Sequence, residues 1–384
     1  MPDRVYLDWN ATTPLRPEAK AAMAAAFEIS GNPSSVHAEG RQARRLVEEA
    51  RASVAAAVGA PVRNVVFSSG GTEANMLALM PGLRRCSGAP VERLLVSAVE
   101  HASVLAGGRF HPEAIGTVGV TRSGVLDLGK LRTALEGGPP ALVSVMLANN
   151  ETGALQPVAE ASEIVHAAGG VLHVDAIQAL GKIPVDIHAL QVDLLTVSAH
   201  KIGGPKGIGA VILAEGLAGL EPLLRGGGQE MGRRAGTENI AGIAGFGAAA
   251  RASIGALAGD SARLEDLRKR LERGLSQEGI IIFSEDVKRL PNTTLFTAPG
   301  LKAETAVIGF DLAGIAVSSG SACSSGKVQP SHVLEAMGFG PELAQGAVRL
   351  SLGRSTCSAD IDRCLEAWRK LSGTLLTRER RNTA

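Results

Sequence analysis

Short apolar runs alternate with helix-forming stretches through most of this 384-residue chain. The apolar runs cover residues 65–67, 93–96, 141–146, 171–174, 194–197 and 210–213. Helical patterns cover residues 38–57, 72–80 and 158–168. Because strands that alternate with helices form parallel sheets with helices on both faces, the pattern predicts an α/β fold.

The composition changes after an Ala- and Gly-rich helical stretch at residues 240–257. A charged amphipathic segment follows at 261–271, and the pattern becomes mixed α+β. The length indicates two domains of typical size, roughly 100 to 200 residues each. We therefore place a large domain at residues 16–255 and a small domain at 1–15 and 256–384, because the start of the chain is expected to pack with the second domain.

The charge balance argues against a nucleic-acid or membrane partner. The chain carries 39 basic and 38 acidic residues, a net charge of +1, so small-molecule chemistry is favoured. Residues 1–8 lack the apolar core of a signal peptide, and no run reaches the roughly 18 apolar residues of a membrane span. The four cysteines have no close paired spacing, so we expect reduced thiols in the cytoplasm rather than disulfides or a metal site.

A lysine follows the run at 194–197, within the sequence Ser198-Ala199-His200-Lys201-Ile202-Gly203-Gly204. If this segment were extended, Ser198 and His200 would share one side and both could donate to a phosphate. Lys201 would then face the opposite side, towards an aldehyde carbon. A solvated loop lysine explains this segment alone equally well.

Asp175 ends the run at 171–174, and ligands of open α/β sheets bind at the carboxyl ends of strands. A carboxylate there can pair with the protonated ring nitrogen of pyridoxal phosphate and keep the ring an electron sink. A purely structural Asp175 would need a nearby cation. Lys182 is the obvious one in sequence, but we expect it in a surface turn before Pro184, so the cofactor role is favoured.

Three further polar segments follow predicted strands. Gly71 and Thr72 open a helix whose free N–H groups suit a phosphate, although a plain capped helix would also explain Thr72. His101 is placed to stack on a cofactor ring and move protons, or to fill a turn. Asn150 suits the ring's phenolic oxygen or a substrate carboxylate, and equally an ordinary turn.

Ten short motifs are spread in order along nearly the whole chain. They are Tyr6-Leu7-Asp8 with Ala11-Thr12-Thr13-Pro14, Gly31-Asn32-Pro33-Ser34-Ser35, Thr72-Glu73-Ala74-Asn75, Glu100-His101, Asn149-Asn150-Glu151, His173-Val174-Asp175-Ala176-Ile177-Gln178, Ser198-Ala199-His200-Lys201, Arg234-Ala235-Gly236-Thr237, Ser318-Ser319-Gly320-Ser321-Ala322-Cys323 and Arg349-Leu350-Ser351-Leu352-Gly353-Arg354. Together they resemble group I cysteine desulfurases, the NifS/IscS branch of the fold-type I pyridoxal-phosphate enzymes. The resemblance implies a large domain with a mostly parallel seven-stranded sheet between helices, and a smaller α+β domain.

The resemblance implies how the cofactor ring is held. Lys201 would form the Schiff base with the cofactor, and Asp175 would pair with its ring nitrogen. Gln178 would hydrogen-bond the ring oxygen O3′. His101 would lie at the ring and take part in proton transfer.

The resemblance also implies a phosphate site and a homodimer. Thr72, Ser198 and His200 would hold the phosphate, with Gly71 in the same turn. A threonine that matches Thr237 reaches the phosphate bound in the neighbouring subunit, so the two sites would be built across the interface.

Cys323 lies in the Ser- and Gly-rich segment 318–327, where a thiol is expected to be exposed and mobile. The resemblance favours Cys323 as the nucleophile that receives sulfur, and it leaves a transient role as an iron-sulfur ligand open. Cys86, Cys357 and Cys364 match no family site.

A substrate carboxylate would meet an arginine. The guanidinium fork suits bidentate capture of a carboxylate, and the motif match favours Arg349 over Arg354 for this role. Asn10 and Asn150 are expected to assist at the same carboxylate.

The activity that the resemblance implies is conversion of L-cysteine to L-alanine. Lys201, with His101 nearby, would move the Cα proton, and the Cys323 thiolate would attack the substrate sulfur. The resulting persulfide would supply an iron-sulfur scaffold or another sulfur acceptor. Two alternatives stay open: a selenocysteine lyase or aminotransferase of the same fold, and a non-catalytic sulfur carrier or interaction subunit.

Overall fold

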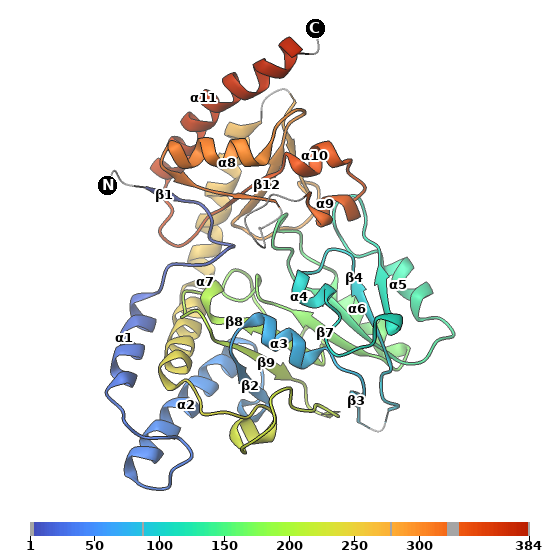
Figure 1. Cartoon of the computed structure of the whole chain (residues 1–384), viewed down its shortest axis with the longest axis vertical. Helices are drawn as coiled ribbons and strands as arrows, with labels where there is room; N and C mark the ends of the chain where they lie inside the picture. Colours follow the sequence, from blue (N-terminus) through green and yellow to red (C-terminus); the bar gives the residue numbers. More distant parts are fainter. Residues whose placement is uncertain (1–3, 87, 277–278, 321–329, 383–384) are drawn as a thin grey trace.

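A seven-stranded sheet forms the centre of the larger part of the molecule (Figure 1). The computed structural model describes residues 4–86, 88–276, 279–320 and 330–382. The strands lie in the order β2 (Val65–Ser68), β9 (Gly209–Leu213), β8 (Leu194–Ser198), β7 (Val171–Asp175), β6 (Ala141–Met146), β4 (Arg93–Ser97) and β5 (Ile115–Val118). Only β9 runs against its neighbours in this sheet, so the sheet is mostly parallel as predicted.

All six apolar runs in the sequence are strands of this sheet. They are recognisable because strands covered on both faces are apolar at almost every position. β5 lies at the sheet edge beside β4 and is only partly buried. Its sequence Ile115-Gly116-Thr117-Val118 therefore lacks a continuous apolar run, and the strand was not predicted.

Helices cover both faces of the sheet. Helices α2 (Ala38–Ala57), α5 (Leu128–Leu135) and α6 (Val158–Ala167) contribute to the main apolar cluster on one face. Helices α3 (Gly71–Ala78) and α4 (Ala102–Leu105) contribute to a second cluster on the opposite face. Alternate residues of β6 enter the two clusters, since successive side chains of a strand point to opposite faces.

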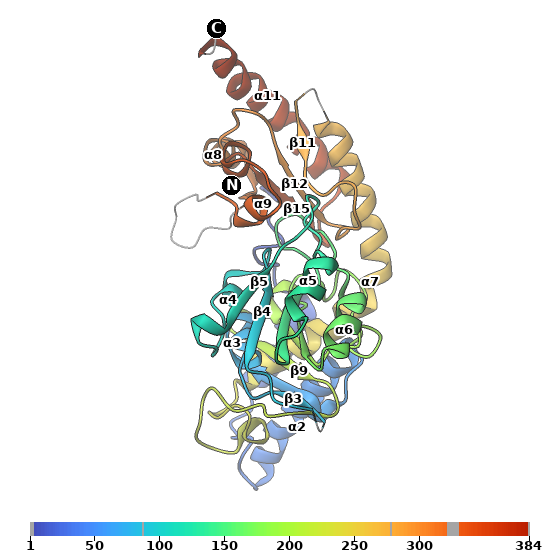
Figure 2. The ribbon, with the colours of Figure 1, turned by 90° about the vertical axis from the view of Figure 1, so that its right-hand side faces the viewer.

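A single long helix, α7 (Ile240–Leu275), joins the two parts of the molecule. Ile243 and Phe246 near its start pack in the sheet cluster, whereas Leu264 and Leu271 pack in a separate cluster. The expected domain boundary near residue 255 therefore falls inside a continuous helix that runs along one side of both parts (Figure 2). Among the described residues α7 alone is long and apolar enough to span a membrane, and 61% of its most apolar window is buried within the protein.

The smaller part contains an antiparallel sheet and its own helices. The strand order is β11 (Ile281–Ile282), β12 (Thr293–Thr297), β15 (Val348–Ser351) and β14 (Ser318–Ser319). The helices are α8 (Ala303–Leu312), α9 (His332–Ala336), α10 (Pro341–Gln345) and α11 (Ser358–Asn382). The N-terminal strand β1 (Val5–Tyr6) pairs with β13 (Ile315–Ala316), and Val5 and Leu7 are buried in this part's core. The chain then passes to α1 (Pro17–Phe27), which packs on α7.

Candidate functional site

A cavity of about 240 Å³ lies where the carboxyl ends of several sheet strands meet. Its walls include Gly71, Thr72, His101, Asn150, Asp175, Gln178, Ser198, His200 and Lys201. All nine were predicted site residues from five separate segments. The structure also adds Ser103, Met146, Ala148 and Ile177, which were not predicted.

Lys201 lies in a turn rather than in an extended segment. β8 ends at Ser198, and Ala199–Lys201 form one turn of 3-10 helix. Because the turn closes after the strand, Ser198, His200 and Lys201 all line the same cavity. The prediction that Lys201 faces away from Ser198 and His200 is therefore wrong.

The Lys201 amine is partly stripped of water. Its Nζ donates to the backbone carbonyl oxygens of Asn10 and Ala11, the latter at 2.9 Å. Burial lowers the pKa of Lys201 to about 8, and the nearby positive charge of Arg349 acts in the same direction. A lysine with a lowered pKa has more neutral amine near neutral pH, which is the form that attacks an aldehyde.

Asp175 presents a buried carboxylate at the end of β7. Oδ1 accepts from the Ile177 backbone N–H at 2.9 Å, and Oδ2 accepts from Asn75 Nδ2 at 3.0 Å. Burial raises the pKa of Asp175, and the Asn75 hydrogen bond opposes that rise. A protonated ring nitrogen placed opposite Asp175 would offset the cost of burying this carboxylate. Asn75 was not singled out in the sequence, although it lies in a quoted motif.

His101 caps the short helix α4 from the side of the cavity. Its Nδ1 accepts from the Ser103 backbone N–H at 3.1 Å and lies 2.8 Å from Ser103 Oγ. Burial lowers the pKa of His101, and the Lys201 charge lowers it further. His101 is therefore neutral at neutral pH, with one ring edge occupied by Ser103.

The phosphate donors predicted from sequence fit an anion. Ser198 Oγ is buried and has no hydrogen-bond partner among the described residues. Thr72 lies at the start of α3, where the first backbone N–H groups have no preceding carbonyl to bond. A Cβ at Gly71 would lie 2.4 Å from Ile177 Cδ1, so a larger residue there would push the Ile177 side chain aside. Together with the Asp175 carboxylate and the Lys201 amine, these groups fit pyridoxal phosphate.

His200 and Thr237, the other two predicted phosphate ligands, line two different cavities. Burial and the nearby lysines lower the pKa of His200 to about 4, so its neutral ring can donate one N–H. Thr237 does not line the first cavity. It lines a second cavity of about 230 Å³ together with Ser68, Ser69 and Arg234.

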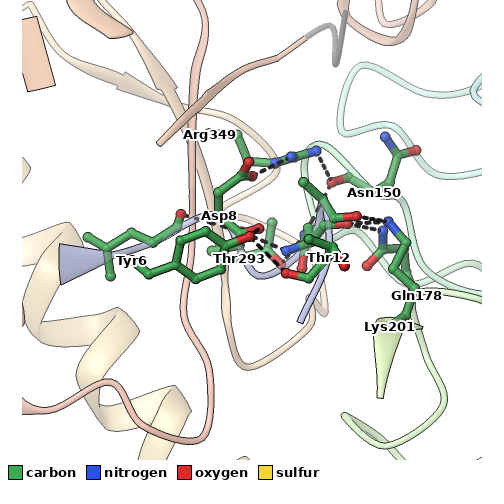
Figure 3. A network of polar contacts seen from close by, with 12 residues as sticks. Tyr6, Asp8, Thr12, Asn150, Gln178, Lys201, Thr293 and Arg349 are labelled. Carbon is green, nitrogen blue, oxygen red and sulfur yellow. Dashed lines mark hydrogen bonds and ion pairs between the residues drawn. The ribbon is translucent and has the colours of Figure 1, made fainter. Parts of the chain in front are cut away.

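Residues 8–13 contact both parts of the molecule: the Trp9 N–H donates to the Ser351 carbonyl, and the Thr13 N–H donates to the His200 carbonyl next to Lys201. Figure 3 shows Asp8 and Thr12 of this segment near Lys201. Asn10 is 1% exposed, and its Nδ2 donates to Thr293 Oγ1 at 2.9 Å and to the Asn150 carbonyl at 3.2 Å. Its Oδ1 accepts from Lys182 Nζ at 2.9 Å. The Asn10 amide is therefore engaged within the protein, and its contact with a substrate carboxylate stays a prediction.

Lys182 is buried, so the prediction that it lies in a surface turn is wrong. Its Nζ donates to Gln178 Oε1 at 2.6 Å as well as to Asn10. With Oε1 directed at the lysine, Gln178 Nε2 donates to the Asn10 carbonyl at 3.0 Å. The partner in the N-terminal segment is 172 positions away, which is why the local sequence did not reveal it.

Arg349 lies on β15 and is 1% exposed. Nη2 pairs with Asp8 Oδ1 at 2.8 Å, Nη1 donates to the Asn150 carbonyl at 3.1 Å, and Nε is buried without a partner among the described residues. Figure 3 shows Arg349, Asp8 and Asn150 close together beside Gln178 and Lys201. A guanidinium with a spare donor so near the Lys201 amine suits an amino-acid carboxylate. Asp8 was not predicted to contribute.

Cys323 lies outside the described residues. Two described residues on either side of it, Gly320 and Ser331, lie beside Glu151. Ser331 Oγ donates to Glu151 Oε2 at 2.5 Å, and a Cβ at Gly320 would lie 3.3 Å from the same oxygen.

The remaining cysteines are placed differently. Cys86 and Cys357 are exposed, whereas Cys364 is buried in the core of the smaller part. Burial raises the pKa of Cys364 to about 12, so its thiol is inert at neutral pH.

The chain belongs to the aminotransferase class-V family, whose model matches residues 5–364. Members of this family are pyridoxal-phosphate-dependent enzymes, in agreement with the cofactor that fits the cavity. Its similar relatives include a cysteine desulfurase of Cereibacter sphaeroides, which is 44% identical over 95% of this chain and 94% of the relative. A cysteine desulfurase IscS of Dictyoglomus turgidum is 40% identical over 98% of this chain and 96% of the relative.

A solved structure leads to the same family. The X-ray structure of a NifS-like protein from Rickettsia africae matches with a TM-score of 0.88 and 37% identity, over 97% of this chain and 100% of that chain. The fold is therefore that of NifS-like pyridoxal-phosphate enzymes.

Proposed function

We propose that this chain is a cysteine desulfurase that converts L-cysteine to L-alanine and transfers the sulfur to Cys323. The observation that carries the proposal is the joint placement of three groups. The low-pKa Lys201 amine shares a cavity with the Asp175 carboxylate, and Arg349 lies close enough to Lys201 to lower its pKa. An amine, a ring-nitrogen partner and a carboxylate fork are what an amino-acid-handling pyridoxal-phosphate enzyme requires.

The cofactor, when bound, supplies an electron sink for negative charge at the substrate Cα. Thr72, Ser198 and His200 would hold its phosphate. Lys201 would accept the proton from Cα as a neutral amine, and Arg349 would bind the substrate carboxylate.

Sulfur transfer requires a second nucleophile. The Cys323 thiolate would attack the substrate sulfur, so that an S–S bond forms while the Cβ–S bond breaks. The electron pair of the broken bond stays on the substrate, which takes up a proton and leaves as alanine. The persulfide on Cys323 would then pass to an iron-sulfur scaffold or another sulfur-acceptor protein.

A homodimer is part of the proposal. Thr237 lies in a second cavity rather than with the phosphate donors of its own chain. Large apolar side chains are also exposed on the larger part: Phe27 is 73%, Val36 is 87% and Met231 is 56% exposed. Pairing with a second copy would cover apolar surface and bring Thr237 to that copy's phosphate. Sedimentation equilibrium tests this proposal, and a monomer at micromolar concentration would contradict it.

The deciding experiment measures sulfide and alanine released from L-cysteine with dithiothreitol, together with the absorption spectrum. Cys323→Ala should abolish both products and keep the absorbance of bound cofactor. Cys357→Ala, which removes an exposed thiol elsewhere, is the matched control and should keep both products.

The alternatives give different results in the same assay. Turnover of amino acids without sulfide, unchanged in Cys323→Ala, would indicate an aminotransferase. Selenide from selenocysteine without sulfide from cysteine would indicate a selenocysteine lyase. No bound cofactor and no product would indicate a sulfur carrier or interaction subunit.

A further inference from the structure

A buried amide connects the two side chains that would act on the cofactor ring. Asn75 lies in the second turn of α3 and is fully buried. Its Nδ2 donates to Asp175 Oδ2 at 3.0 Å and to Ser103 Oγ at 2.9 Å. Ser103 Oγ in turn lies 2.8 Å from His101 Nδ1. Asn75 therefore uses both of its N–H groups towards the cavity.

A hydrogen bond on the other side of Asn75 identifies which end of its amide is the oxygen. Asn75 Oδ1 accepts from Thr196 Oγ1 at 2.6 Å, and Thr196 Oγ1 lies 3.2 Å from His173 Nε2. Thr196 has one hydroxyl proton, which it gives to Asn75, so His173 must donate from Nε2. The other ring nitrogen, Nδ1, then accepts from Ser144 Oγ at 2.8 Å. Burial lowers the pKa of His173 to about 3, in agreement with this neutral form.

The same counting of protons fixes the ring of His101. Ser103 Oγ accepts from Asn75 and has one proton of its own, which it gives to His101 Nδ1. The Ser103 backbone N–H also points to Nδ1 at 3.1 Å. A nitrogen that faces two donors cannot carry a proton, so the neutral ring is protonated on Nε2.

We propose that Asn75 is a positioning residue whose single amide holds the Asp175 carboxylate and, through Ser103, keeps His101 in the Nε2–H tautomer. His101 then offers its Nε2–H to whatever group lies beside that nitrogen, as a hydrogen-bond donor. In this form Nε2 cannot take up a proton from the substrate, which assigns proton acceptance in the resting site to the Lys201 amine. This catalytic consequence rests on the proposed function, whereas the tautomer depends only on the protein's own hydrogen bonds.

The electrostatic surroundings of His101 act on its charge and not on the choice of tautomer. Asp175 favours the protonated ring, while Lys201 and His332 oppose it, and burial opposes it most. The tautomer must therefore be measured where the ring is neutral, above pH 7.

The test is long-range 1H–15N correlation spectroscopy of the histidine rings in the 15N-labelled apoenzyme. The chain has eight histidines, and His101→Gln identifies the signal of His101 by its loss. In the wild type we expect Nδ1 to resonate as an unprotonated nitrogen and Nε2 as a protonated one. A protonated Nδ1, or an even mixture of tautomers, would overturn the proposal.

Two variants test the link through Asn75. Ser103→Ala removes the hydroxyl and leaves Asp175 untouched, and Asn75→Leu removes the amide. Loss of one hydrogen bond should shift the tautomer ratio about fivefold towards the Nδ1–H form in both. Asn75→Leu, but not Ser103→Ala, should also weaken binding of pyridoxal phosphate to the apoenzyme by roughly tenfold or more, because Asp175 loses a donor.

Matched controls separate this effect from general loss of stability. Ser253→Ala and Asn64→Leu each remove a buried side chain that bonds a backbone carbonyl elsewhere, Ala250 and Leu213 respectively. Both should keep the wild-type His101 signal. An unchanged tautomer ratio in Ser103→Ala and Asn75→Leu, relative to these controls, would refute the role of Asn75 even if the chain desulfurates cysteine.

Discussion

The buried ion pair between Arg51 and Glu230 supports a stability prediction that the structure makes quantitative. Arg51 Nη1 and Nη2 bond the two carboxylate oxygens of Glu230 at 2.5 and 2.8 Å, and both side chains are at most 5% exposed. Glu230 also accepts from the Phe67 backbone N–H at 2.9 Å. The pair thus ties α2 and β2 to the turn Gln229–Gly232, in which Glu230 and Met231 have left-handed backbone conformations.

Arg51→Met removes one partner and leaves a buried carboxylate with a single backbone donor. Breaking a buried pair in this way costs about 3–5 kcal/mol of folding free energy. The double variant Arg51→Met with Glu230→Leu removes both charges, so it should cost clearly less than the single variant. Both expectations follow from the cost of burying an unpaired charge, since methionine and leucine fill much of the volume of the arginine and glutamate side chains that they replace.

Urea unfolding followed by circular dichroism measures these differences. Arg45→Met is the control on the same helix, because Arg45 pairs with Glu49 while 80% exposed, and its loss should change stability by less than about 1 kcal/mol. An Arg51→Met variant as stable as the control would refute the reasoning. So would a double variant that is less stable than Arg51→Met.

Three further predictions concern the site and the buried Glu100 next to His101 in the sequence. Because the pKa of Lys201 is lowered to about 8, the rate at which the apoenzyme reacts with pyridoxal phosphate should rise with pH to a midpoint near 8. Arg349→Leu removes a nearby positive charge and should move that midpoint upward. Stopped-flow absorbance measures the rate, and a midpoint unchanged in Arg349→Leu would contradict the effect of Arg349 on Lys201. Arg349→Leu should also raise the KM for L-cysteine roughly 10- to 100-fold, and steady-state kinetics with an unaltered KM would exclude carboxylate binding there. Burial raises the pKa of Glu100 well above its ordinary value, so the stability that the protonated group confers is complete below about pH 4.3 and is lost as the pH rises towards the raised value. Glu100→Gln should therefore stabilise the protein increasingly from pH 4.5 to pH 8, and thermal melts with a pH-independent difference would contradict this.

The sheet and most of its site loops were predictable because their signals are local. The run Val171–Val174 is apolar at nearly every position since β7 is covered on both faces, and the carboxyl end of the strand locates Asp175. The same logic located Ser198, His200 and Lys201 after β8. Two features were not predicted. The edge strand β5 is only partly buried, which weakens its apolar pattern, and the composition changes along α7, which suggested a boundary inside a continuous helix.

The directions and partners of the site side chains depend on contacts that the sequence does not encode locally. The turn at Ala199–Lys201 brings Lys201 to the same cavity as Ser198 and His200, and the buried Lys182 donates to Asn10, 172 positions away in the sequence. The role of Asn75 is visible only in the folded chain, because its hydrogen-bond partners Asp175, Thr196 and Ser103 come from three other segments.

Local sequence patterns predict the α/β class, the strands of the main sheet apart from β5, and the set of polar residues at the strand ends, because apolar periodicity and strand-end position follow from backbone geometry. Which polar groups are buried away from water, which are paired, and how their protons are arranged becomes visible only in the folded chain. Those properties arise from burial and from hydrogen bonds between residues far apart in the chain, such as Arg349 and Asp8, and no local pattern specifies them.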